Sequence, residues 1–156
     1  MLPDPDTPAP GQVTRAVFCT GKIYYDLAAY RRERNISDTV IIRLEQIYPL
    51  AQEQLTYLLA PYQKVRDFVW CQEEPSNMGA WGHLRNRLGR LFATSFRYAG
   101  RPFMACPAEG AKALHAALPW RGSWVFPPKR CTPPHKKDSS PLPSGRGLNP
   151  EPILLP

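Results

Sequence analysis

The chain has 156 residues, a length that favours one domain, and its four cysteines show no paired spacing. The formal net charge of +7 is uneven, because residues 121–156 hold six Lys or Arg against only Asp138 and Glu151. No apolar run approaches the roughly 20 residues that a membrane-spanning helix needs. The cysteine pattern argues against a secreted protein stapled by disulfides, which form in oxidising compartments. The absence of a long apolar run argues against a transmembrane segment.

Apolar spacing along the chain predicts strands and helices in strict alternation. Residues 1–12 are acidic and rich in proline, which predicts an extended lead-in. The elements expected after it are a strand at 14–20, a helix at 22–34, a strand at 39–44, a helix at 51–59, a strand at 65–72, a helix at 80–91, a strand at 96–100 and a helix at 109–117. The run 39–44 (Thr-Val-Ile-Ile-Arg-Leu) is apolar on both faces, as in a parallel sheet that is covered on both sides.

This alternation predicts an α/β domain over residues 13–118, with three layers and a mostly parallel sheet of about four to five strands between helices. Residues 119–156 are rich in proline and basic side chains, and they are predicted to form a disordered tail. Within the tail, the aromatic segment 120–126 is expected to dock on the domain.

The most distinctive segment is 70–81, with the sequence Trp-Cys-Gln-Glu-Glu-Pro-Ser-Asn-Met-Gly-Ala-Trp. It is predicted to run from the end of a strand through a turn into a helix, where α/β folds place ligand sites. The alternative is structural: Glu73 and Glu74 pair locally while the turn residues shape the helix entry. Adjacent carboxylates point to opposite sides of an extended backbone, so they make a poor acid/base pair.

Five blocks resemble a known family in their order and spacing. They are residues 19–27 (CTGKIYYDL), 42–49 (IRLEQIYP), 72–81 (QEEPSNMGAW), 98–102 (YAGRP) and 107–110 (PAEG), the last followed by His115. Together they resemble the C-terminal domain of the first, thiamine-diphosphate-dependent component of 2-oxoglutarate dehydrogenase. The related 2-oxoadipate enzymes share much of this pattern, so the substrate of the parent enzyme stays open between the two.

The resemblance implies the fold of a transketolase C-terminal domain and a role in supporting the dimer. In such enzymes thiamine diphosphate and Mg²⁺ lie between the two preceding domains, so this segment is expected to hold no cofactor and no metal and to be inactive alone. The implied partners are the remainder of the first component, a second copy of it and, through the parent, the dihydrolipoyl succinyltransferase complex. The implied location is the bacterial cytoplasm or the mitochondrial matrix.

The resemblance also indicates candidate interface and effector-binding residues. The motif and candidate interface residues are Gln72, Glu73, Glu74, Pro75, Asn77, Gly79 and Trp81. Some family members bind a nucleotide or acetyl-CoA effector on this domain, and Lys22, Arg43 and Gln46 are the candidates for that site, because cations suit phosphate. The alternative is that these three residues simply end a strand or start a helix and face solvent.

The chain departs from the family after His115, where Pro119 interrupts the expected final helix. This departure suggests a truncated or altered C-terminus, and hence a fragment of the parent enzyme. The second hypothesis is a free-standing α/β binding module whose basic tail engages nucleic acid or an acidic partner; specific nucleic-acid binding is the less favoured interpretation. Cys131 and His135 offer two zinc ligands where a structural site needs four.

Overall fold

The computed structural model describes residues 6–106 together with Val125 and Phe126. The elements in this part are a single 3₁₀ turn (Pro10–Gln12), β1 (Arg15–Cys19), α1 (Ile23–Glu33), β2 (Thr39–Arg43), α2 (Gln52–Leu59), β3 (Asp67–Pro75), α3 (Trp81–Leu91) and β4 (Phe96–Arg101). None of these helices combines the length and the apolar character needed to cross a membrane.

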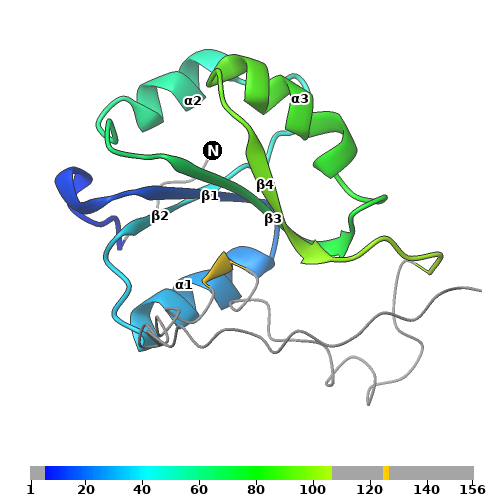
Figure 1. Ribbon diagram of the computed structural model, residues 1–156, viewed down its shortest axis with the longest axis horizontal. Helices are drawn as coiled ribbons and strands as arrows, with labels where there is room; N and C mark the ends of the chain where they lie inside the picture. Colours follow the sequence, from blue (N-terminus) through cyan, green and yellow to red (C-terminus); the bar gives the residue numbers. More distant parts are fainter. Residues whose placement is uncertain (1–5, 107–124, 127–156) are drawn as a thin grey trace, which may run out of the picture.

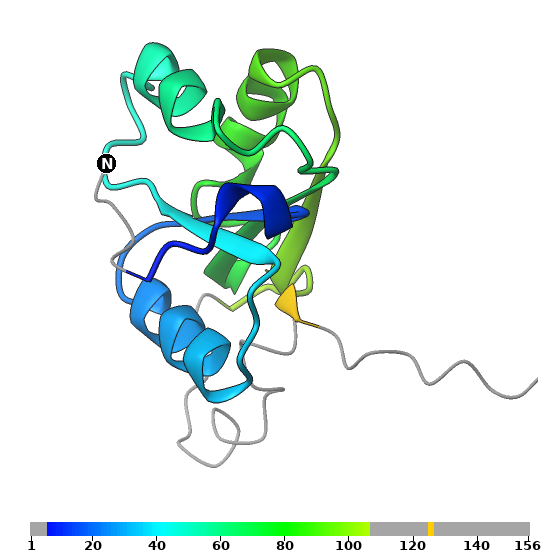
Figure 2. The same cartoon turned by 90° about the vertical axis from the view of Figure 1, so that its left-hand side faces the viewer.

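The four strands form one parallel sheet in the order β2-β1-β3-β4. Helices α2 and α3 cover one face of this sheet, and α1 covers the other (Figures 1 and 2). The predicted three-layer α/β architecture with a mostly parallel sheet is therefore confirmed. Because all strands run in one direction, their carboxyl ends meet at one edge of the sheet, and the loops that follow them share that edge.

Strand β1 shows why the sheet is buried on both faces. Ala16 and Phe18 pack on the side of α2 and α3, while Val17 and Cys19 pack on the side of α1. Successive side chains of a strand point to opposite faces, so a continuous apolar run serves two cores at once.

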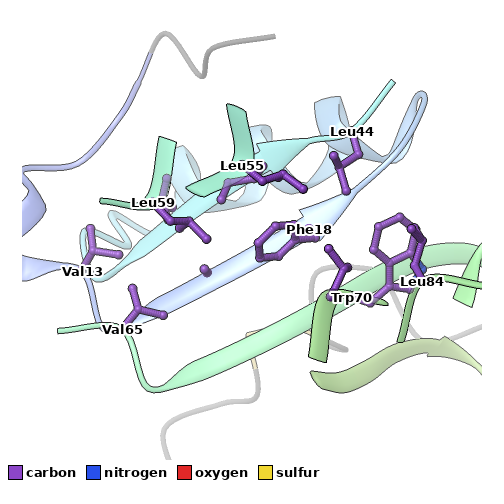
Figure 3. Packing of buried hydrophobic residues seen from close by; sticks show 12 residues of the cluster. Val13, Phe18, Leu44, Leu55, Leu59, Val65, Trp70 and Leu84 are labelled. Carbon is purple, nitrogen blue, oxygen red and sulfur yellow. The ribbon is translucent and has the colours of Figure 1, made fainter. Parts of the chain in front are cut away.

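The larger core lies between the sheet and the helices α2 and α3. Leu55 and Leu59 of α2 point towards Phe18, with Trp70 and Leu84 beside it (Figure 3). The Phe18 ring also meets the Phe96 ring edge-on, with the centroids 5.2 Å apart. Aromatic side chains thus fill much of the space where the central strands meet α3.

The smaller core, on the α1 face, includes two described residues from beyond position 106. Val125 and Phe126 are both buried in this core. The Phe126 ring stacks on that of Tyr30 with centroids 5.6 Å apart, and Arg15 Nη1 donates a hydrogen bond to the Val125 carbonyl at 3.3 Å. At these two residues the expected docking of the aromatic segment is observed, although they fall inside the range predicted as a disordered tail.

Arg31, in the last turn of α1, does not face solvent. Its side chain is buried and donates hydrogen bonds to the carbonyl oxygens of Thr39 at 3.4 Å and Asp6 at 2.9 Å. The Asp6 carboxylate lies 3.6 Å from Arg32. These contacts fasten the lead-in segment to α1 and β2.

Left-handed residues follow the strand expected at 14–20 and the helix expected at 22–34. Gly21 follows β1 with φ +70°, and Asn35 follows α1 with φ +50°, a left-handed conformation that these two residue types tolerate best. The helix predicted at 109–117, His115, the zinc candidates and most of the predicted tail lie outside the described residues.

Candidate functional site

Strand β3 continues through the distinctive motif instead of ending before it. The strand was predicted to end at Gln72, but β3 reaches Pro75, with a register irregularity against β4 between Cys71 and Pro75. Glu73 and Glu74 are therefore strand residues, and the turn that leads into α3 starts later. The reason is pairing with β4, in which Pro75 lies opposite Arg101. The Tyr98 hydroxyl oxygen supports this end of the strand, since it lies 2.8 Å from the carbonyl oxygens of both Glu74 and Arg101.

Gln72 holds the turn and the start of α3 from inside the domain. Its side chain is fully buried, and its Oε1 accepts hydrogen bonds from Trp70 Nε1 at 2.8 Å and from the Trp81 backbone N–H at 3.1 Å. Its Nε2 donates to the carbonyl oxygens of Met78 at 2.7 Å and Pro75 at 3.1 Å. A buried amide that engages both its carbonyl and its NH₂ group fixes the two ends of the turn relative to the sheet.

Gly79 is the position where this turn has no room for a side chain. Its φ is +65°, and a Cβ built there would lie 2.9 Å from Gln72 Nε2. Two residues before it, Asn77 Nδ2 donates to the Met104 carbonyl at 3.0 Å, and Asn77 Oδ1 accepts from the Met104 N–H at 3.1 Å. The turn is therefore fixed on one side by Gln72 and on the other by the segment that follows β4.

The adjacent carboxylates point to different surroundings. Glu73 Oε1 lies 3.5 Å from Lys22 Nζ, while Glu74 is exposed and contributes its backbone carbonyl to Tyr98. This arrangement matches the opposite orientation that an extended backbone imposes. As a chemical unit, the motif orders a turn and supports one surface ion pair.

Arg43 is held firmly at the carboxyl end of β2. Its Nε pairs with the Glu45 carboxylate, and its Nη1 donates to the Tyr25 hydroxyl at 3.1 Å. Its guanidinium carbon lies 5.2 Å from the ring centroids of both Tyr24 and Tyr25. The hydrogen bond from Arg43 lowers the pKa of Glu45, and the same bond raises the pKa of Arg43.

The three effector candidates lie after neighbouring strands, but their side chains make different contacts. Lys22 follows β1 and is largely exposed beside Glu73, whereas Arg43 is engaged by Glu45. Gln46 turns away into its own loop, where Nε2 donates to the Pro49 carbonyl at 3.0 Å. A phosphate at Arg43 would have to replace the Glu45 carboxylate, and an effector site built from these residues stays a prediction.

Sequence reasoning missed the aromatic side chains at the same edge. Tyr25, Tyr48 and Phe103 follow the carboxyl ends of β1, β2 and β4, and all three are exposed. The signal that would have found them is a large aromatic residue in each of the short segments or first helical turns that follow these strands, where polar residues are more usual. Within residues 6–106 and 125–126, no three His, Cys, Asp or Glu side chains come together in a way that could hold a metal ion.

Comparison with known proteins identifies the family. The model of the 2-oxoglutarate dehydrogenase C-terminal family matches residues 1–118. The chain is 47% identical over 108 residues to a 2-oxoglutarate dehydrogenase E1 component from Haemophilus influenzae, an alignment that covers 68% of this chain and 12% of that protein. It is 40% identical over 121 residues to the E1 component from Azotobacter vinelandii, covering 74% of this chain and 13% of that protein.

The E1 component from Coxiella burnetii is 38% identical over 122 residues, covering 76% of this chain and 13% of that protein. The chain thus spans about an eighth of the length of the curated relatives that it matches. The matched residues include β1 to β4, the Gln72 turn and the Arg43 loop. The chain belongs to the 2-oxoglutarate dehydrogenase C-terminal family.

Proposed function

We propose that the chain serves as the C-terminal structural domain of a 2-oxoglutarate dehydrogenase E1 component. The observation that carries this proposal is the family match over residues 1–118, which includes all four strands of the sheet. In this proposal the parent enzyme decarboxylates 2-oxoglutarate oxidatively with thiamine diphosphate and Mg²⁺ held by its preceding domains. The present domain completes the folded subunit, supports its dimer and is inactive alone.

The chemistry of the carboxyl edge supports a structural role. Glu73 is engaged by Lys22, Glu45 by Arg43, and Gln72 by the backbone of the turn. These groups therefore stabilise local structure, whereas a general acid or base must reach the proton that it transfers. The proposed partners are the rest of the E1 chain, a second E1 subunit and, through them, the dihydrolipoyl succinyltransferase of the complex.

A fused enzyme tests the proposal. The matching C-terminal region of the Haemophilus influenzae E1 component is replaced by this chain, and 2-oxoglutarate-dependent reduction of an artificial electron acceptor is measured with thiamine diphosphate and Mg²⁺ added. We expect activity well above that of the same E1 protein lacking its C-terminal region, and no activity from the chain alone. A fused enzyme no more active than the shortened E1 would refute the proposal.

The binding-module alternative depends on the basic residues of the tail. Lys129, Arg130, Lys136 and Lys137 lie outside the described residues, and no contact of the described part favours nucleic acid. The alternative therefore stays a sequence-based hypothesis, and the E1-domain proposal is the one that specific contacts support.

A further inference from the structure

The exposed aromatic side chains gather at one edge of the sheet. The large hydrophobic side chains most exposed among the described residues are Tyr25 (60%), Tyr48 (76%), Tyr57 (83%) and Phe103 (77%). Tyr25 lies in the first turn of α1, which follows β1, while Tyr48 and Phe103 lie in the segments after β2 and β4. Tyr57 lies farther from a strand end, in the second half of α2. Large apolar side chains concentrated on one surface mark an interaction site, whereas single scattered ones need no explanation.

Side-chain contacts join this edge into one surface. Tyr25, in the first turn of α1, accepts a hydrogen bond from Arg43 at the end of β2. The Tyr48 ring meets that of His83 at the start of α3, with centroids 6.2 Å apart. The paired hydrogen bonds between Asn77 and Met104 connect the turn after β3 to the segment that carries Phe103. Loops from all four strands are therefore coupled, and we call this surface the carboxyl-edge surface.

Two ion pairs lie on the carboxyl-edge surface. Lys22 pairs with Glu73, and Arg43 pairs with Glu45. Charges that are paired within the domain can enter an interface without being left unpaired, which is the costly outcome. By contrast, the outward arginines of α3 (Arg85, Arg87 and Arg90) are exposed and make no ion pair with other described residues. Covering that helix face with protein would require acidic partners.

We infer that the carboxyl-edge surface, with Tyr25, Tyr48 and Phe103 as anchors, is where this domain packs against the preceding part of a 2-oxoglutarate dehydrogenase E1 chain. This inference rests on the proposed function. The relatives continue for seven-eighths of their length beyond the matched region, so the family domain has a large covalent neighbour to contact. The carboxyl edge of a parallel sheet is also where α/β folds build ligand clefts, which commonly lie between domains.

Footprinting of the fused enzyme described above tests the surface directly. Hydroxyl-radical labelling read by mass spectrometry is compared between the isolated 156-residue chain and the fusion. We expect labelling of Tyr25, Tyr48 and Phe103 to fall about tenfold in the fusion, as for anchors in a desolvated interface, while Tyr57 is labelled equally in both. Three aromatics that are already protected in the isolated chain, or that stay labelled in the fusion, would overturn the inference.

Matched substitutions in the fusion supply the second measurement. Tyr25→Ser, Tyr48→Ser and Phe103→Ser are combined in one variant, and Tyr57→Ser is the control, since it removes a more exposed ring from outside this surface. We expect the triple variant to lose activity at least about thirtyfold, equivalent to one hot-spot contact, and the control to stay within about twofold of the parent fusion. Circular dichroism of the isolated variants verifies that each still folds.

The two measurements distinguish a failure of the carboxyl-edge surface from a failure of the proposed function. An active fusion whose activity is insensitive to the triple substitution, or more sensitive to Tyr57→Ser, refutes the carboxyl-edge surface and leaves the proposed function intact. An inactive fusion, with labelling unchanged everywhere, refutes the proposed function and this inference with it.

Discussion

Gln72 shows how one buried amide can determine a local structure. It lies in β3 beside Trp70, where an apolar residue would normally stand, yet it makes four hydrogen bonds of 3.1 Å or shorter. Buried polar groups are tolerated when they are satisfied in this way, and they then fix a single arrangement of the groups around them. The Gln72 side chain therefore links the fully buried part of β3 to the start of α3.

Replacing Gln72 by leucine should lower the free energy of unfolding by roughly 2–4 kcal/mol, because the buried N–H groups of Trp70 and Trp81 would lose their acceptor. Urea unfolding followed by circular dichroism measures this change. The control is Gln54→Leu on the exposed side of α2, which should stay within about 0.5 kcal/mol of the parent. Equal stabilities for the two variants would contradict the role assigned to Gln72.

Tyr98 should make the stability of the domain fall at high pH. Burial raises its pKa from the ordinary value of 10 to about 12. Because the pKa of Tyr98 is higher in the folded than in the unfolded state, the neutral side chain contributes its full stabilisation below pH 10. This contribution is lost as the pH rises towards 12. We expect Tyr98→Phe to weaken the loss of stability over this window, while Tyr57→Phe, at an exposed site, leaves it unchanged. Denaturant midpoints measured at pH 9 to 12 check the prediction, and identical pH slopes for both variants would contradict it.

At the scale of elements, the β3–α3 unit combines what sequence reasoning found with what it missed. Its strand, turn and helix were predicted in the right order, and α3 presents Leu84 and Leu88 to the core as the spacing indicated. The end of β3 was placed too early, because Glu-Glu-Pro is typical of a turn. Pairing with β4 overrides that local preference, and it could not be read from residues 70–75 alone.

Substitutions at two glycines of this unit, Gly79 and Gly82, should change stability in opposite directions. Gly79→Ala should destabilise the domain by about 1–3 kcal/mol, because the residue has φ +65° and a Cβ would press on Gln72. Gly82→Ala should stabilise it by up to about 1 kcal/mol, since this glycine lies in α3 with nothing within 4 Å of a new Cβ. The thermal unfolding temperatures of the two variants are compared with that of the parent chain. Shifts of both temperatures in the same direction would contradict the prediction.

At the scale of the whole molecule, two cores share one sheet, and the α1 face has an additional cover. Val125 and Phe126 lie beyond the residues that match the family model, yet they are buried against α1 and the sheet. The docked pair removes apolar surface from water on a face where α1 is the only described helix. The domain core therefore includes residues that the family boundary leaves out.

Phe126→Ala should cost roughly 3–5 kcal/mol of stability, the usual range for deleting a buried phenylalanine. Phe103→Ala is the matched control, because it removes the same ring from a site that is 77% exposed, and the isolated chain should tolerate it within about 0.5 kcal/mol. Chemical unfolding of both variants provides the measurement. A Phe126→Ala variant as stable as the control would show that the segment does not cover the α1 face.

The sequence by itself determined the α/β class, the order of the elements and the family, because these follow from local periodicity and from contiguous blocks such as residues 72–81. The stops at Gly21 and Asn35 were also predictable, since positive φ restricts the residue type. Tertiary structure alone decided the strand order, the pairing of Arg43 with Glu45 beside Tyr25, and the gathering of three exposed aromatics at one edge. Those features depend on which strands become neighbours, and that depends on contacts between residues far apart in the chain.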